Sequence, residues 1–251
     1  MISWHNRYLG MKKILILTAF FLLIPLWSFS KVYLVSVGIS DYPGNDMDLN
    51  LSDKDAQTIT WLYSKNKGLH YCQLLNEKAT QENIIKAMES VYSKASENDI
   101  VVLFYSGHGY EGGFYVYDGC MGYDKIRQAM AKSECKNKMI FADACFSGKI
   151  RTNGNTSPQS QVADAKKANV MLFLSSRSNE YSYERSDMEN GFFTTYLQKG
   201  LRGSADKNKN RIITAKELFE YVHSRVSEIS NGQQHPVMWG KFSDNMTIMQ
   251  W

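Results

Sequence analysis

Four strongly apolar runs recur along the chain, at residues 31–40, 99–109, 138–144 and 168–176. A strand with one face in water alternates apolar and polar residues, whereas a strand covered on both faces is apolar throughout. The four runs therefore predict buried strands at the centre of a sheet.

Segments with helical periodicity separate these runs. The pattern predicts helices at residues 51–68, with Ser52 as the cap, at 79–95, opened by Thr80, and at 123–134, about 191–201 and 214–229. It also predicts a short strand at 71–75, a small hairpin at 112–124 and an edge strand or hairpin at 237–251. Strands that alternate with helices indicate an α/β fold, with a largely parallel sheet covered on both faces.

The first thirty residues have a different composition. Two lysines at 12 and 13 precede an apolar run from Ile14 to Trp27, and Ser28-Phe29-Ser30 has the small-x-small pattern of a cleavage site. This is typical of a secretory signal peptide, although a retained membrane anchor is the alternative. We expect residues 1–30 to be a signal peptide, residues 31–251 to be one domain, and the product to be periplasmic or secreted.

The net charge and the number and spacing of the cysteines argue against several classes of function. Removing residues 1–30 lowers the formal net charge from +4 to +1, so no basic patch indicates a nucleic-acid partner. Export would let disulfides persist, but the four cysteines form neither a disulfide framework nor a CxxC metal motif. A Cys120–Cys135 pair stays open as an alternative.

Two polar motifs follow two of the predicted central strands. The segment "YSGHG" holds Ser106, His108 and Gly109, and "DACFSG" holds Asp143 and Cys145. Ligand sites of parallel sheets lie beyond the carboxyl ends of the strands, so we expect both motifs at one rim.

A cysteine thiol becomes a good nucleophile when a neighbouring imidazole can take its proton. Cys145 would attack a carbonyl, His108 would take the thiol proton and later protonate the leaving amine, and the amides of Gly109 and Cys145 would form an oxyanion hole. The alternatives are a buried core cysteine, a structural histidine, or a zinc site that lacks the usual ligand spacing.

Asp143 carries a second prediction. Residues two apart share one side of a strand, so Asp143 accompanies Cys145 and Ser106 accompanies His108. A carboxylate so close to a thiolate is unfavourable unless a cation joins it. We therefore expect Asp143 to line a pocket for a lysine or arginine side chain of the substrate.

The two motifs, 37 residues apart, resemble those of the caspase-fold cysteine peptidases, most closely the metacaspases and their bacterial relatives. The resemblance covers nearly all of residues 31–251 and implies a three-layer α/β/α caspase-like fold with a mostly parallel central sheet. It implies peptidase activity after Lys or Arg, with Asp143 and Asp55 as acidic pocket residues and Ser106 in the substrate site. The alternative for Asp55 is an acid in the first turn of a helix, favoured by the helix dipole.

The chain also departs from the metacaspase pattern. Phe146 stands where many metacaspases have histidine, and Thr152 stands where the calcium-binding group has aspartate; the acidic loop holds only Glu111, Asp118 and Asp124. We therefore expect no cofactor, and calcium is the alternative. A second calcium candidate matches EF-hand spacing but has Arg211 where glycine is needed, and its alternative is a turn that caps the helix from Thr214. Its four ligand positions are Asp206, Asn208, Asn210 and Glu217.

The loop after Cys145 contains basic residues that such an enzyme would accept. Lys149 and Arg151 lie within it, and Lys166 and Lys167 follow it, so self-processing is one hypothesis and an ordinary exposed loop the other. Two functions stay open: an exported cysteine endopeptidase acting on protein or peptide substrates, with no membrane attachment after signal cleavage, and a caspase-like regulatory or interaction domain with little turnover.

Overall fold

A six-stranded sheet forms the centre of the protein. The structure, a computed structural model, describes residues 30–66, 68–110, 112–144, 170–177, 180–185, 187–240 and 242–250. The strand order is β10-β8-β7-β3-β1-β2, and only the edge strand β10 runs antiparallel to its neighbour. The strands are β1 (Val32–Gly38), β2 (Leu69–Leu75), β3 (Ile100–Ser106), β7 (Asn137–Asp143), β8 (Val170–Leu174) and β10 (Val237–Gly240). The mostly parallel sheet and its four buried strands are confirmed.

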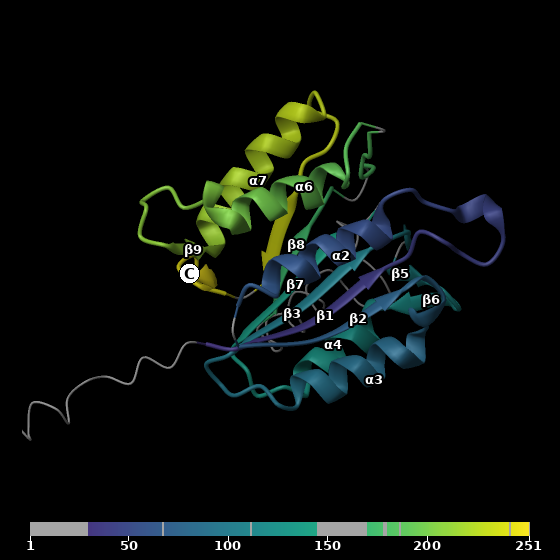
Figure 1. Ribbon diagram of the computed structural model, residues 1–251, viewed down its shortest axis with the longest axis horizontal. Coiled ribbons are helices and arrows are strands. Elements are labelled where there is room, and N and C mark those ends of the chain that lie inside the picture. Colours follow the sequence, from purple (N-terminus) through teal and green to yellow (C-terminus); the bar gives the residue numbers. More distant parts are fainter. Residues whose placement is uncertain are drawn as a thin grey trace, which may run out of the picture.

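Helices cover both faces of this sheet (Figure 1). One face carries α2 (Ser52–Tyr63), α6 (Phe192–Lys199) and α7 (Ala215–Ile229), and the other carries α3 (Gln81–Tyr92) and α4 (Tyr123–Ala131). Each central strand contributes side chains to two hydrophobic cores, one on each face of the sheet, because its side chains alternate between the faces. In β3, Phe104 packs beneath α2, α6 and α7, whereas Tyr105 packs on the side of α3 and α4. The α/β/α layering is therefore as expected.

Two small sheets and three short turns of helix complete the described structure. The hairpin predicted at 112–124 is present as β5 (Gly113–Val116) and β6 (Gly119–Gly122), with β4 (Gly109–Tyr110) added beside β5. The second sheet pairs β9 (Ile212–Thr214) with β11 (Thr247–Gln250). The short turns are η1 (Asn45–Met47), η2 (Asn76–Lys78) and η4 (Gly200–Ser204).

The hairpin alternative for the last residues is wrong. β10 joins the main sheet, where it pairs with β8, and β11 pairs with β9 instead of folding back on β10. The reason is burial, because Ile213 of β9 and Ile248 of β11 both enter the core beneath α7. The edge-strand alternative is confirmed for β10.

The start of α2 differs from its prediction. Ser52 is the first helical residue and is buried, and the N-cap position belongs to Leu51, whose side chain makes no capping bond. The hydroxyl of Ser40 takes over that role by accepting the backbone N–H of Asp53 at 3.0 Å. A distant residue thus ties the start of α2 to the segment after β1.

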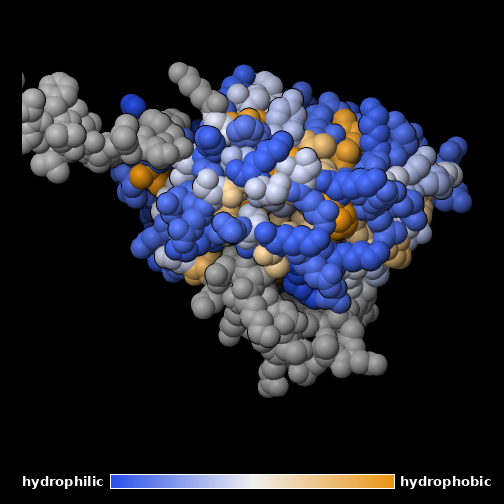
Figure 2. Space-filling view, turned by 90° about the horizontal axis from the view of Figure 1, so that it is seen from below, coloured by the Kyte–Doolittle hydropathy of each residue, from blue (hydrophilic) through white to orange (hydrophobic). Residues whose placement is uncertain are grey.

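Seen from below the view of Figure 1, the described surface is mostly hydrophilic, with small separate apolar patches (Figure 2). Within the described ranges, no helix combines the length and apolar character needed to cross a membrane.

The register of the sheet places three strand ends side by side. Gly38 of β1 is the partner of Ser106 in β3, and Ser106 is in turn the partner of Asp143 in β7. Alternation directs Ser106 and Asp143 to the face covered by α2 and α6. Two of the predicted site residues therefore meet at this rim.

Candidate active site

His108 follows β3 and is held through its own backbone. Its N–H donates to the hydroxyl of Tyr42 at 2.9 Å, and its carbonyl accepts from the hydroxyl of Tyr105 at 2.8 Å. The ring of Tyr42 also packs against the imidazole, with centroids 5.0 Å apart. Two tyrosines that are almost fully buried thus fix the position of the histidine.

The imidazole has one assigned partner. Its Nε2 lies 2.7 Å from the carbonyl oxygen of Met47, in η1. Because a carbonyl only accepts, Nε2 carries the hydrogen, and in the neutral ring Nδ1 keeps its lone pair. Met47 therefore selects the tautomer in which Nδ1 can act as a base.

Gly107 explains how His108 comes so close to the two tyrosines. A methyl group on Gly107 would lie 2.6 Å from the hydroxyl of Tyr105 and 2.7 Å from that of Tyr42. Its N–H donates to the carbonyl of Asp143 at 3.2 Å, which joins the segment after β3 to the end of β7. A side chain at this position would displace the hydroxyls that hold His108.

Asp55 and Asp143 form a buried acidic pair next to this rim. Asp55, on α2, is 1% exposed, and Asp143, at the end of β7, is 6% exposed. The Ser106 hydroxyl donates to Asp55 Oδ2 at 2.8 Å, so all three predicted pocket residues belong to one cluster. Asp55 does lie in the first turn of α2, as the helix-dipole alternative requires. Its carboxylate is nevertheless buried in the interior, so helix position alone does not account for it.

The start of α6 supplies the remaining partners of the pair. Asn190 Nδ2 and the Gly191 N–H donate to Asp55 Oδ1 at 2.8 and 3.2 Å. The N–H and the hydroxyl of Thr194 donate to Asp143 Oδ2 at 3.1 and 2.8 Å. The hydroxyl of Ser182, in the segment after β8, is a further donor to Asp143. Sequence reasoning missed these residues because no local pattern relates positions 182–194 to positions 55 and 143.

Gly191 marks the space between the two acids. A methyl group on this residue would lie 2.9 Å from Asp143 Oδ2 and 3.5 Å from Asp55 Oδ2. Both carboxylates therefore pack against Gly191, and a larger residue at this position would displace the carboxylate of Asp143.

Burial dominates the electrostatics of the pair. It raises the pKa of Asp55 well above its usual range, and the charge of Asp143 raises it further. Burial also raises the pKa of Asp143, against the hydrogen bonds from Thr194 and Ser182 that favour its ionised form. Each acid therefore holds a proton more readily than a free aspartate does.

A third acid, Glu184, stands at the edge of the cluster. Its carboxylate accepts the backbone N–H groups of Asn50 and Leu51, just before α2. Glu184 is exposed as a residue, but desolvation of its carboxylate and then the charge of Asp143 raise its pKa, while Lys54 acts in the opposite direction. Glu184 belongs to the segment "FLSSRSNEYSYE" that resembles the caspase fold, yet nothing in one sequence distinguishes it from neighbouring surface acids.

Cys145 and residues 146–169 lie outside the described residues, and so do Glu111, Phe146, Thr152 and the basic residues of the self-processing hypothesis. The description of β7 and its extension ends at Ala144, one position before the predicted nucleophile. The predicted Cys145–His108 contact and the oxyanion hole with Gly109 therefore stay predictions.

The other three cysteines are free. Cys135 is buried, Cys72 is half-buried and Cys120 is exposed, so the alternative of a Cys120–Cys135 disulfide is wrong. Burial raises the pKa of Cys135 and of Cys72, which makes both thiols poorer nucleophiles.

The EF-hand-like segment forms a tight turn before α7. The carboxylate of Asp206 accepts the N–H groups of Asn210 and Arg211, and Arg211 has a φ of 65°. Thr214 and Glu217 form a reciprocal capping box at the start of α7. The described part of the chain contains no group of three or more His, Cys, Asp or Glu side chains arranged to hold a metal.

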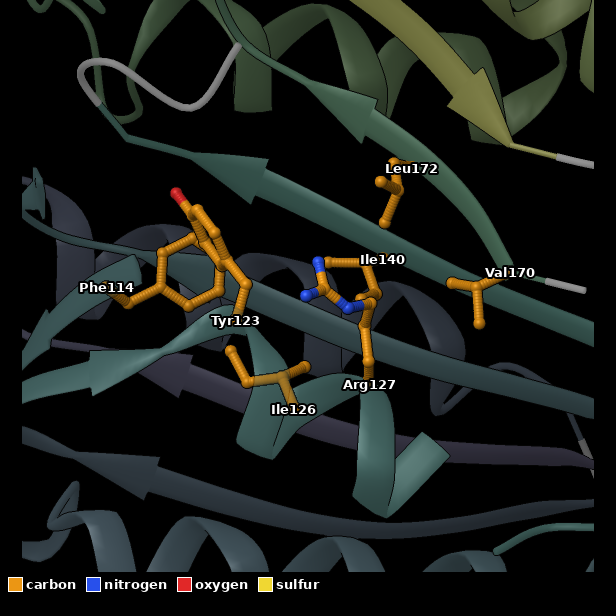
Figure 3. Close-up of a pocket in the computed structure, with 7 residues that line it drawn as sticks. All are labelled: Phe114, Tyr123, Ile126, Arg127, Ile140, Val170 and Leu172. Carbon is orange, nitrogen blue, oxygen red and sulfur yellow. The ribbon is translucent and has the colours of Figure 1, made fainter. Parts of the chain in front are cut away.

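A separate apolar pocket lies on the opposite face of the sheet, between α4 and the strands β7 and β8. Figure 3 shows the residues that line it: Phe114, Tyr123, Ile126, Arg127, Ile140, Val170 and Leu172. None of the predicted site residues is among them, so this pocket is distinct from the acidic pair.

Comparisons with known proteins agree with this architecture. A family profile for the caspase domain matches residues 32–246. The crystal structure of a Geobacter sulfurreducens protein has a TM-score of 0.63 at 18% identity, covering 87% of this chain and 97% of that one. The structure of pro-sf-caspase-1 has a TM-score of 0.62 at 15% identity, covering 87% and 94%. No curated protein matches the chain. The match over residues 32–246 shows that the chain belongs to the caspase-domain family, whose members are cysteine peptidases.

Proposed function

We propose that the protein is a cysteine endopeptidase that cleaves protein or peptide substrates after lysine or arginine. The observation that carries the proposal is the buried Asp55–Asp143 pair, whose carboxylates both pack against Gly191 and whose Asp143 carbonyl accepts the N–H of Gly107, next to His108. Membership of the caspase-domain family supports the peptidase chemistry. The acidic pair supports the choice of a basic residue before the scissile bond.

The proposed mechanism uses one thiol and one imidazole. Nδ1 of His108 takes the proton of the Cys145 thiol, and the thiolate attacks the scissile carbonyl carbon. The amides of Gly109 and Cys145 donate to the oxyanion of the tetrahedral intermediate. His108 returns its proton to the leaving amine, which leaves a thioester, and water then hydrolyses the thioester. The hydrogen bond that Nε2 donates to the carbonyl of Met47 supports this assignment, because it leaves Nδ1 free to exchange the proton.

The acids would select the substrate by charge. A lysine or arginine side chain between Asp55 and Asp143 would supply the cation that the pair lacks among its described partners. Ser106 holds Asp55 in place, and Glu184 adds a negative charge at the edge of the site. An acidic substrate residue would meet like charges and be rejected.

The decisive experiment measures cleavage of matched reporter peptides that end in Lys, Arg, norleucine, citrulline or Asp. We expect cleavage of the Lys and Arg peptides, and loss of at least a thousandfold in kcat/KM in Cys145→Ala. Cys120→Ala, at an exposed cysteine away from the proposed machinery, is the matched control and should keep full activity.

Asp143→Asn tests the specificity separately. The variant should lose the preference for Lys and Arg over their neutral analogues. Activity that survives Cys145→Ala would contradict the mechanism, and an unchanged preference in Asp143→Asn would contradict the pocket. Correctly folded protein without turnover on any peptide would favour the caspase-like regulatory domain.

Two further proposals concern export and self-cleavage of the chain. We propose export to the periplasm or the medium after cleavage of residues 1–30, and self-cleavage after Lys149, Arg151, Lys166 or Lys167. Intact-mass analysis of the secreted product would test the first. For the second, wild type should yield two fragments on a denaturing gel while Cys145→Ala stays whole; identical migration after long incubation would exclude self-cleavage.

A further inference from the structure

Lys31, the residue that would follow the predicted signal cleavage, is bonded to the start of the sheet. Its backbone N–H donates to Asp99 Oδ1 at 2.9 Å, and its carbonyl accepts the N–H of Ile100 at 2.9 Å. The next residue, Val32, opens β1 and donates its N–H to the carbonyl of Gly68 at 3.1 Å. Both backbone groups of Lys31 are therefore attached to the chain at the start of β3.

Asp99 is a buried carboxylate with a fixed position. It is 8% exposed and lies just before β3, where its Oδ2 accepts the backbone N–H of Ser96 at 2.8 Å. Its carbonyl accepts hydrogen bonds from the thiol of Cys135 at 2.9 Å and from Nδ2 of Asn137 at 3.2 Å. The carboxylate is therefore held beside the nitrogen of Lys31 through its side chain and its main chain.

No cation within the described ranges neutralises this carboxylate, since none of their ion pairs includes Asp99. Lys136 pairs instead with Glu97, an exposed acid in the same turn. Lys138, on β7, is buried, which lowers its pKa, and the charged group that acts on it is Cys135. Asp99 thus has hydrogen-bond donors but no opposite charge.

Neighbouring groups respond to this negative charge. Burial and then the charge of Asp99 raise the pKa of Tyr33, on β1. Burial first, and the same charge more weakly, raise the pKa of Cys135. A buried carboxylate without a cation is unfavourable, so a positive charge next to Asp99 would stabilise the fold.

Cleavage between Ser30 and Lys31 would change the chemistry of the nitrogen that Asp99 already binds. In the uncut chain this nitrogen belongs to a neutral amide. Hydrolysis adds water across the amide bond, which leaves a carboxylate on Ser30 and an α-ammonium on Lys31. A free α-amine has a pKa of about 7.7–8.0, so the ammonium form prevails at neutral pH and below. Hydrogen bonds from an ammonium to a carboxylate are about twice as strong as those between neutral groups.

We propose that Asp99 binds the α-ammonium of Lys31 in the processed chain, so that removal of the signal peptide creates an ion pair that the precursor lacks. This inference rests on the proposed export step, because cleavage after Ser30 is the source of the charge.

The ion pair would lie far from the candidate active site. The strands β1 and β3 begin side by side, with Val32 the register partner of Ile100 (Figure 1). Ser106 and Asp143 lie at the opposite ends of their strands. We therefore expect the pair to act on the stability of the fold and not on the chemistry of the reaction.

The pair makes stability depend on pH in a defined direction. The charge of Asp99 favours the ammonium, so the pKa of this amine should be higher in the folded than in the unfolded chain. The stabilisation should be fully present below the unfolded value of about 7.7 and be lost as the pH rises through the folded value.

The experiment compares two purified chains that differ by one residue at the N-terminus. One begins at Lys31, and the other retains Ser30, which keeps the Lys31 nitrogen as an amide and moves the ammonium one residue outward. Both carry Cys145→Ala, so self-cleavage cannot shorten them. Differential scanning calorimetry should give the chain that begins at Lys31 a Tm higher by about 3 °C near pH 6, with the difference vanishing toward about pH 10.

Variants identify the partner of the ammonium. Asp99→Asn should remove the difference between the two chains, because an asparagine oxygen still accepts the N–H but carries no charge. Glu97→Gln, at the exposed acid of the same turn, is the matched control and should preserve the difference. Acetylation of the α-amine needs no substitution and should lower the Tm of the chain that begins at Lys31 to that of the longer chain. A difference that survives Asp99→Asn, or that Glu97→Gln abolishes, would overturn the assignment to Asp99.

The outcomes separate this inference from the proposals on which it rests. Equal Tm values for the two chains at every pH would overturn the ion pair and leave the proposed export standing. An exported product whose intact mass shows a first residue other than Lys31 would overturn the cleavage position, and the inference with it. The proposed peptidase activity is tested independently with the reporter peptides.

Discussion

At the scale of single residues, the site depends on contacts that hold a functional group without touching substrate. Tyr42 is the example, since its hydroxyl accepts the N–H of His108 and donates to the carbonyl of Tyr115 at 3.0 Å. The tyrosine lies on the segment after β1, whereas His108 follows β3. The histidine is therefore positioned by residues from outside its own motif.

Tyr42→Phe should lower kcat about fivefold and change KM little, because one hydrogen bond of about 1 kcal/mol no longer fixes the histidine. Steady-state kinetics with a lysine reporter peptide would measure this, together with the pH dependence of kcat. Tyr71→Phe, at an exposed tyrosine of β2, is the control and should match wild type. A Tyr42→Phe effect confined to KM would contradict the positioning role.

Gly191→Ala should abolish the preference for basic residues. The added methyl group would displace the carboxylate of Asp143, and a displacement of about 1 Å is enough to cost about a hundredfold in kcat/KM. Gly122→Ala is the control for a glycine at the start of a helix, because a methyl group there would come no closer than 3.9 Å to the carbonyl oxygen of Gly112. Retention of full activity by Gly191→Ala would show that the position of the Asp143 carboxylate does not set the preference.

At the scale of elements, the central strands and most helices could be predicted because the pattern of apolar and polar residues that defines each one lies within a single continuous segment. Val32–Gly38 and Ile100–Ser106 are mostly apolar and buried throughout, and Thr80 caps α3 as expected, accepting the N–H of Asn83. The pairing of β9 with β11 could not be predicted, since the two strands lie far apart in the chain and are short. The prediction of Ser52 as the cap of α2 is wrong for a similar reason. The N–H of Asp53 donates to the hydroxyl of Ser40, which is distant in the sequence.

The residues of the candidate site likewise fall into those that the sequence could identify and those that only the folded structure identifies. His108, Ser106, Asp55 and Asp143 could be chosen from motifs, since each lies in a recognisable local pattern. Asn190 and Thr194 could not, because their role exists only once α6 docks its first turn on the two acids. Tertiary contact, rather than residue type, makes them part of the site.

The capping box of α7 makes a prediction at this scale. Thr214→Ala should lower the free energy of unfolding by about 1 kcal/mol, because the N–H of Glu217 loses its acceptor and Glu217 loses the Thr214 hydroxyl. Urea unfolding monitored by circular dichroism would measure it. Activity per folded molecule should be unchanged, and a loss of activity larger than the loss of folded protein would contradict a purely structural role.

At the scale of the whole molecule, the buried acids should give stability an unusual pH dependence. Their pKa values are raised in the folded state, so between the unfolded and folded values the native chain holds protons that the unfolded chain has released. Their contribution to stability is therefore greatest at low pH and is lost as the pH rises through the folded values.

Comparing Tm for wild type and Asp55→Asn isolates this effect, because other titrating groups are common to both. The variant should gain stability relative to wild type as the pH is raised from about 4 to 8, by several degrees in Tm. Differential scanning calorimetry at a series of pH values would show it. A constant difference in Tm would mean that the pair does not change its protonation in that range.

The arrangement of the acidic pair also has a consequence for a chain that has been cut. Asp55 and Asp143 precede residue 145, whereas Asn190, Gly191 and Thr194 follow residue 169. A break between these positions would leave two polypeptides, each with half of the site, and β7 would still pair with β8 across them. The processed protein should therefore behave as a non-covalent heterodimer whose two chains elute together under native conditions. Neither chain alone should recognise a basic side chain.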